Sequence, residues 1–193
     1  DLDEADRAEF NSVIENFIRN NPEVVRDSLI ALAAREEAAR KQAGLAKVRE
    51  DLGDPVMGNP DGKITLYEFS DYNCGYCKRI FEPIQKLLRD NPDVRLVIKE
   101  FPILSPSSLV AAKAAIAAEM QGKFGAYHIA MMTYRGQITD DVVMRLAAQA
   151  GVDEKQLKLD MENQKTAAII QRTREAATSK RPSKTRPRRR RPR

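Results

Sequence analysis

Few of the side chains that bind metal ions occur in this sequence, which has two cysteines and one histidine among its 193 residues. A closed structural zinc site needs about four ligands, most often cysteine or histidine. Cys74, Cys77 and His128 cannot complete such a site unless carboxylates or a partner chain contribute. The sequence therefore favours redox chemistry over metal binding for its cysteines, and we expect neither a metal nor an organic cofactor.

Long apolar runs are also missing. A helix that crosses a bilayer needs about 20 consecutive apolar residues, and no run in the sequence approaches that length. We therefore expect no transmembrane segment. The sequence begins at Asp1 and not at a methionine, which either a removed export signal or a trimmed chain would explain. We expect an exported protein, in the periplasm or a similar compartment.

Basic residues are unevenly distributed, although the formal net charge is +5. Residues 172–193 contain eleven Lys or Arg and one Glu, whereas residues 1–171 contain 22 basic and 27 acidic side chains. The end of the chain has no apolar periodicity and three prolines, so we expect residues 176–193 to be a disordered, Arg-rich tail. This tail lacks interleaved aromatic residues and a reading helix, which disfavours nucleic acid as a partner.

The two cysteines lie where a strand is followed by a helix, in the segment KITLYEFSDYNCGYCKRIFEPIQKLL (63–88). Residues 63–69 are rich in β-branched and aromatic side chains, and apolar residues at helical spacing follow a turn. Asn73 is the expected N-cap, which places Cys74 at the positive end of the helix dipole, where a thiolate is stabilised. Cys77 lies one turn further along the same face and can form a disulfide with Cys74.

A carboxylate is also expected near the cysteines. Ile64, Leu66 and Glu68 share one face of the predicted strand, because side chains alternate between the two faces of a strand. Glu68 therefore lies among apolar neighbours, six residues before Cys74. We expect desolvation to raise the pKa of this carboxyl.

The segments YEFSDYNCGYCK and KEFPILSPSS resemble the corresponding segments of periplasmic DsbA-like thiol oxidoreductases of the thioredoxin superfamily. The dipeptide Gly75-Tyr76 is similar to the motif of the related isomerase DsbC, whereas DsbA itself has Pro-His there. The resemblance extends over about residues 1–171. It implies an α/β fold in which a thioredoxin-like βαβ unit carries an inserted helical domain, and it implies that Glu68 is a buried acid that assists proton transfer.

Three further residues flank the cysteines. Tyr72, Gly75 and Tyr76 are candidate substrate contacts, although the two tyrosines would equally suit partly buried positions at the rim of the site. His128, in the segment GAYHIAMM, is expected to be a helix residue with a satisfied hydrogen bond and not a catalytic group. Nothing in the sequence places His128 near Cys74.

Four segments are expected along the chain. Residues 1–52 form helices interrupted at Asn20-Asn21-Pro22, which either associate chains as an oligomerisation stalk or lie along their own catalytic domain. Residues 53–104 form the βαβ unit, with 53–62 as a linker and strands at 63–69 and 94–101. Residues 105–175 form the inserted helical domain, whose last helix is expected at 154–175, and residues 176–193 form the tail.

The end of the chain departs from the family pattern. Family members continue from the last helix into a loop with a cis-proline, two strands and a helix, but no proline lies between Pro106 and Pro182. We therefore expect an incomplete sheet of two strands and an Arg-rich end of replaced or frame-shifted origin. An open sheet edge should lower stability and slow the reaction with protein substrates.

The interpretation that follows is a thiol-disulfide oxidoreductase, either an oxidase or an isomerase. It would act on exported cysteine-containing proteins through Cys74 and Cys77 and exchange electrons with a redox partner protein. The alternative is an impaired or vestigial family member that acts as a binding protein, with its basic tail on nucleic acid or an anionic surface. Thiol-exchange activity distinguishes the two.

Overall fold

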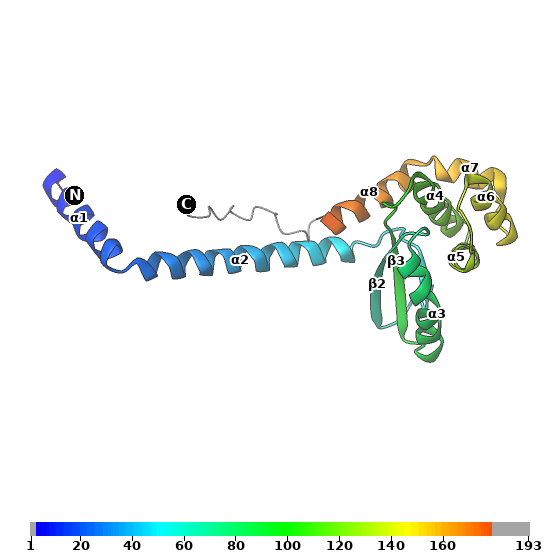
Figure 1. Ribbon diagram of the computed structural model, residues 1–193, viewed down its shortest axis with the longest axis horizontal. Helices are drawn as coiled ribbons and strands as arrows, with labels where there is room; N and C mark the ends of the chain where they lie inside the picture. Colours follow the sequence, from blue (N-terminus) through cyan, green and yellow to red (C-terminus); the bar gives the residue numbers. More distant parts are fainter. Residues whose placement is uncertain (1–2, 179–193) are drawn as a thin grey trace, which may run out of the picture. The chain divides into compact units, whose positions relative to one another are not determined.

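The computed structural model describes residues 3–178, and the chain divides into two units after Gly44. Figure 1 shows the course of the chain. No helix in the described part is long and apolar enough to cross a membrane.

The first unit contains α1 (Glu4–Asn20) and most of α2 (Pro22–Arg49). Asp3 caps α1, because its carboxylate accepts the backbone N–H of Asp6 at 2.9 Å. Pro22 begins α2, and the predicted interruption at Asn20-Asn21-Pro22 is confirmed. Both helices expose apolar side chains, which in α1 are Phe10, Val13, Ile14, Phe17 and Ile18 and in α2 include Val24, Val25, Leu29, Ile30 and Leu32.

The sheet has three strands in the order β1-β3-β2. β2 (Ile64–Ser70) is parallel to β3 (Val94–Glu100), and α3 (Gly75–Asp90) joins them, which confirms the predicted βαβ unit (Figure 1). The expectation of two strands was wrong, because β1 (Val56–Gly58) pairs with β3 in antiparallel fashion. This strand lies within the predicted linker. It has three residues, too few to show the alternation that identifies a strand in a sequence.

Gly58 ends β1 where the chain turns toward β2. Its φ is 76°, a left-handed conformation that favours glycine, and a Cβ added there would lie 2.6 Å from the Val94 carbonyl oxygen. Only glycine fits this approach to β3. β2 follows at one edge of the sheet, where Ile64 and Leu66 are exposed.

The two faces of β3 have different surroundings. Leu96 and Ile98 join the main core together with Phe81 of α3. On the other face, the buried Lys99 Nζ donates to Asp54 Oδ2 at 2.8 Å and to the Glu50 carbonyl oxygen at 2.6 Å. Arg172 of α8 (Gln164–Thr178) donates to the same Asp54 oxygen at 2.6 Å. Asp54 therefore links β3 and α8 to the segment that precedes β1.

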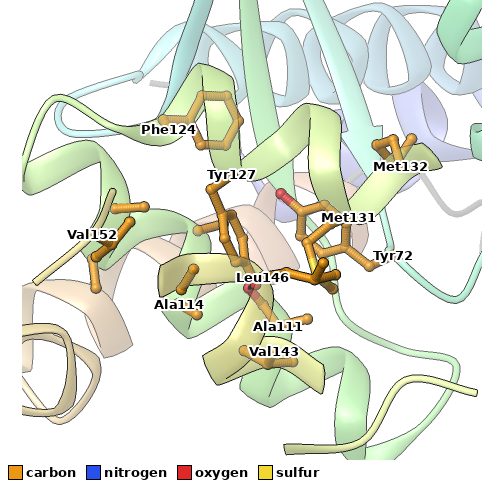
Figure 2. Packing of buried hydrophobic residues seen from close by; sticks show 14 of the residues in the cluster. Tyr72, Ala111, Ala114, Phe124, Tyr127, Met131, Met132, Val143, Leu146 and Val152 are labelled. Carbon is orange, nitrogen blue, oxygen red and sulfur yellow. Dashed lines mark hydrogen bonds between the residues drawn. The ribbon is translucent and has the colours of Figure 1, made fainter. Parts of the chain in front are cut away.

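An alanine-rich helix, α4 (Pro106–Met120), is the centre of the helical domain. Ser105 Oγ accepts the Ser108 N–H at 3.2 Å and caps the helix, and Pro106 occupies its first position, where a missing N–H costs nothing. The small side chains of α4 let α5 (Phe124–Thr133), α6 (Asp140–Gln149) and α7 (Glu154–Met161) pack against it. Figure 2 shows Ala111 and Ala114 among larger residues such as Tyr127, Leu146 and Val152.

The single helix expected at 154–175 is two helices, α7 and α8. Asn163 interrupts them, because its Oδ1 accepts the Lys165 N–H at 2.9 Å at the start of α8. α8 continues to Thr178, so residues 176–178 are helical and do not belong to a tail. The rest of the predicted tail, from residue 179, lies outside the described residues.

Asp54 offers a test of this packing. We expect Asp54→Ala to lower the free energy of unfolding by about 3 kcal/mol or more, because it leaves the buried Lys99 charge without its carboxylate. The matched control is Asp51→Ala, which removes a pair with Arg95 whose side chains are 24% and 22% exposed. The control should cost less than about 1 kcal/mol. Urea denaturation measures both losses, and equal losses would contradict a buried role for Asp54.

Candidate active site

Cys74 itself is the N-cap of α3. Its backbone is extended, with φ −80° and ψ 108°, and its Sγ accepts the Cys77 N–H at 3.2 Å. The prediction that Asn73 caps the helix was therefore wrong by one residue. The sulfur replaces the usual oxygen of an N-cap, receives a backbone hydrogen bond and lies at the positive end of the helix.

Asn73 has a different role. Its Nδ2 donates to the hydroxyl oxygens of Ser105, Ser107 and Ser108 at 2.9, 3.2 and 2.9 Å. These serines lie at the start of α4. Asn73 therefore ties the cysteine loop to the helical domain.

Cys77 differs from Cys74 in its surroundings. Both cysteines are free thiols at partly buried positions. Burial, followed by the hydrogen bond with Cys74, raises the pKa of Cys77 to about 11. Cys77 is consequently a thiol at neutral pH, and it must lose its proton before it can attack a disulfide.

Asp71 holds the loop that carries Cys74. Its carboxylate accepts the backbone N–H groups of Ile103 and Leu104 at 2.9 and 3.0 Å, and that of Asn73 at 2.9 Å. Its carbonyl oxygen also accepts the Cys74 N–H at 2.9 Å. One buried side chain thus fixes the loop to the segment that follows β3.

Tyr72 is 1% exposed, so the expectation that it contacts substrate or lies at the rim needs correction. Its Oη lies 3.0 Å from Glu100 Oε1 and 2.9 Å from His128 Nδ1. Figure 2 shows its ring within the core of the helical domain. The ring can be buried because its hydroxyl has hydrogen-bond partners inside the protein. The sequence alone does not reveal these partners.

His128 is buried in the core and has Tyr72 as a hydrogen-bond partner. A helix residue with a satisfied hydrogen bond was likewise expected from the sequence. Its ring also contacts Phe81 and Phe124, with centroids 5.6 and 5.0 Å apart. Burial lowers the pKa of His128 to about 3. The imidazole is therefore neutral at physiological pH.

Glu68 lies on β2, and burial raises the pKa of its carboxyl, in the direction expected from the sequence. Its charge is also one of the influences that raise the pKa of Cys77, after burial and the contacts with Cys74. Ile64 and Leu66, which share its face, are exposed. The expected apolar surroundings therefore do not come from these two residues.

Gly75 and Tyr76 face the surface between the cysteines. Tyr76 is 76% exposed, and the Arg79 guanidinium lies over its ring, with the Arg79 Cζ 4.1 Å from the centroid. A Cβ on Gly75 would have the Arg79 side chain as its nearest neighbour, at 3.9 Å. Both residues remain candidates for contact with a substrate.

Two site residues escaped the sequence interpretation, namely Asp71 and Glu100. Asp71 lies within the turn predicted between the strand and the helix, where an aspartate is ordinary. Glu100 is fully buried at the end of β3, and burial raises its pKa well above the ordinary range. A glutamate at the end of a buried apolar strand was the available signal.

Residues 50–185 match the family model described as Thioredoxin, which is well over half of the chain. The chain belongs to the thioredoxin family. A thioredoxin-like oxidoreductase from Silicibacter pomeroyi DSS-3 is 42% identical, with a TM-score of 0.65 over 68% of this chain and 76% of that chain. A periplasmic thioredoxin-like protein from Salmonella enterica serovar Typhimurium is 30% identical, with a TM-score of 0.60 over 70% and 76% of the two chains.

A DsbA-type relative extends the comparison. The thiol-disulfide exchange protein alpha-DsbA2 from Wolbachia pipientis is 24% identical, with a TM-score of 0.67 over 75% of this chain and 79% of that chain. Membership of the thioredoxin superfamily is confirmed, and the fold resembles that of this DsbA-type protein, an α/β thioredoxin-like fold with inserted helices.

Longer proteins also match. The Na(+)/H(+) antiporter NhaA 1 of Salinispora arenicola (strain CNS-205) is 27% identical over 151 residues, which are 72% of this chain and 23% of that protein. The chain thus spans about a quarter of the length of such a curated relative.

His128 and Glu100 should have opposite effects on the pH dependence of stability. A histidine whose folded pKa is lowered withdraws stability as pH falls through the range from its ordinary value near 6.5 to about 3. His128→Phe should therefore gain stability relative to the natural chain by about 1.4 kcal/mol per pH unit on acidification from about pH 6 to 4. Urea denaturation at several pH values measures this difference.

Glu100→Gln supplies the opposing control. A carboxyl whose folded pKa is raised contributes stability below its ordinary pKa and loses it as pH rises. The benefit of Glu100→Gln should therefore grow on alkalinisation from about pH 4.5. Differences that do not change with pH for either variant would show that neither buried group is neutral in the fold.

Proposed function

We propose that this protein is a thiol-disulfide oxidoreductase that acts on cysteine-containing proteins outside the cytoplasm, through Cys74 and Cys77. The observation that carries the proposal is the position of Cys74 Sγ as the cap of α3, 3.2 Å from the Cys77 N–H. The family and the solved relatives named above support this activity. Export is supported by the periplasmic Salmonella relative.

Cys74 is the sulfur that reacts with substrates. In the oxidising direction, a substrate thiolate attacks Cys74 Sγ of the disulfide, and the electron pair of the broken bond leaves on Cys77. A second substrate thiolate then attacks the substrate sulfur of the mixed disulfide and releases Cys74 as a thiolate. In the isomerising direction, the Cys74 thiolate attacks a wrong substrate disulfide, and a later substrate thiolate releases it.

The other site residues support these steps. Cys77 resolves mixed disulfides after it gives up its proton, and Glu68 is the proposed acceptor because its carboxyl has a raised pKa. The dipeptide Gly75-Tyr76 favours an isomerase or reductase, whereas the chain as a whole resembles DsbA. A redox partner protein would restore the working oxidation state in either direction.

The order of thiol reactivity tests this function. Iodoacetamide should label Cys74 of the reduced protein ahead of Cys77 at about pH 6, because the raised pKa of Cys77 keeps it protonated. Peptide mass spectrometry identifies the labelled residue. In an insulin-reduction assay, Cys74→Ser should abolish activity, and Cys77→Ser should accumulate a mixed disulfide.

Three results would contradict this assignment. Faster labelling of Cys77 would reverse the assigned roles. Full insulin reduction by Cys74→Ser would remove this pair from the reaction, and the absence of activity in the natural chain would favour a binding protein instead.

We further propose that the N-terminal helices associate copies of the chain. The apolar stripe of α2 includes Val25, Leu29 and Leu32, which are 40–60% exposed. Exposed apolar residues at helical spacing are buried when another helix covers them. A second copy presents the same stripe and is the proposed cover.

Sedimentation velocity tests the association. Leu29→Asp with Leu32→Asp should shift the full chain toward the monomer, because each change puts a charge into the proposed contact. Ala34→Asp adds the same charge on the opposite side of α2 and should leave the mass unchanged. A monomer in the natural chain would exclude self-association.

A further inference from the structure

Two buried side-chain oxygens beside the active site have no hydrogen-bond partner among the described residues. They are Ser70 Oγ and Glu100 Oε2. Ser70 is 2% and Glu100 0% exposed, so bulk solvent does not supply the missing bonds. Buried polar atoms in folded proteins are nearly always satisfied, and an internal water molecule serves where the protein offers no partner.

The two oxygens come from residues that face each other. Ser70, at the end of β2, is the register partner of Glu100 at the end of β3. Paired residues of neighbouring strands point to the same face, with backbones roughly 4.8 Å apart. Glu68 lies two residues before Ser70 and therefore shares that face. Three oxygen-bearing side chains thus gather where the strands lead into the cysteine loop.

The contacts of Tyr72 occupy one of the two carboxyl oxygens of Glu100. Tyr72 Oη has one hydrogen, yet it lies 3.0 Å from Glu100 Oε1 and 2.9 Å from His128 Nδ1. When Tyr72 donates to Glu100 Oε1, the His128 Nδ1–H donates to Tyr72, and Glu100 Oε2 can hold a proton and donate it elsewhere.

The surroundings of Glu100 favour its neutral form. Burial raises the pKa of Glu100 most, and the charges of Asp71, Glu68 and Asp54 raise it further, whereas the hydrogen bond from Tyr72 lowers it. Burial, followed by the charge of Glu100, raises the pKa of Tyr127 of α5. His128 of the same helix is neutral. None of the described salt bridges gives Glu100 a cationic partner.

We propose that Glu100 remains a protonated acid and positions Glu68 for proton exchange with Cys77, through one internal water held between Ser70 Oγ and Glu100 Oε2. Glu100 donates its proton to the water in a hydrogen bond, and the water donates to the Glu68 carboxylate. The inference rests on the proposed function of Cys77. Glu100 is a positioning residue in this arrangement, because it acts through Glu68.

The proton balance of the step is simple. When a thiolate attacks Cys74 Sγ, a sulfur–sulfur bond forms at Cys74 and the bond to Cys77 breaks. The released electron pair stays on Cys77 Sγ, which takes a proton from the Glu68 carboxyl. The carboxylate left on Glu68 is stabilised by the hydrogen bond from the water. Resolution by Cys77 runs the same transfer in reverse.

Variants at both ends of the water site give a measurable shift. Ser70→Ala removes one support of the water, and Glu100→Leu removes the other together with the donor. Each should raise the pKa of Glu68 by about one pH unit, since the carboxylate loses a hydrogen bond. Glu100→Gln keeps a donor and should restore a value near that of the natural chain. Thr173→Val is the matched control, since its buried hydroxyl also lacks a partner but lies on α8.

Carbon-13 NMR of the reduced protein, labelled at its glutamate carboxyls, measures these titrations directly. Glu68→Gln assigns the Glu68 signal. Glu100 should not titrate near the ordinary pKa of a glutamate, and Thr173→Val should change nothing. The pH profile of glutathione release from a mixed disulfide with Cys74 should shift with the Glu68 titration. In the Glu68→Gln background, Ser70→Ala should have no further effect on that profile.

Two outcomes would overturn the inference. One is a Glu100 signal that titrates near the ordinary pKa of a glutamate. The other is a pKa of Glu68 that neither Ser70→Ala nor Glu100→Leu changes. Failure of the proposed function is separate, because the NMR titrations do not require activity. A natural chain that exchanges no disulfide but shows the expected shifts would reject the function and retain the buried arrangement.

Discussion

The geometry of the site depends on the hydrogen bonds made by one buried carboxylate, that of Asp71. It accepts hydrogen bonds from the backbone N–H of Asn73, which follows β2, and from those of Ile103 and Leu104, which follow β3. The turn into α3 is therefore rigidly placed, and the cap at Cys74 follows from it.

The side chains next to Asp71 extend this anchoring in two directions. Tyr72 points into the core, where it meets Glu100 of β3 and His128 of α5. Asn73 points to the serines at the start of α4. The sheet and the helical domain consequently share the cysteine loop as a common boundary. This explains why a loop that carries reactive thiols can remain ordered beside a large inserted domain.

Local chemistry was sufficient to predict much of the fold. The helix starts at Pro22 and Pro106, the strands on either side of α3 and the pair Cys74 and Cys77 could be identified from residue type and spacing. β1 could not, because a strand of three residues exists only through its pairing with β3. The break at Asn163 and the burial of Tyr72 were missed for a related reason. Each depends on a hydrogen bond, at Lys165 in one case and at Glu100 in the other.

The ion pairs of Asp54 join parts of the chain that are synthesised at different times. Asp54 and Lys99 are 45 residues apart in the chain, but Arg172 is separated from Asp54 by 118. A chain is synthesised from its N-terminus, so all three strands are present well before α8 emerges. During that interval the Lys99 face of β3 lacks the helix that later packs against it. A chain interrupted before α8 would leave this face of β3 open to proteases and chaperones.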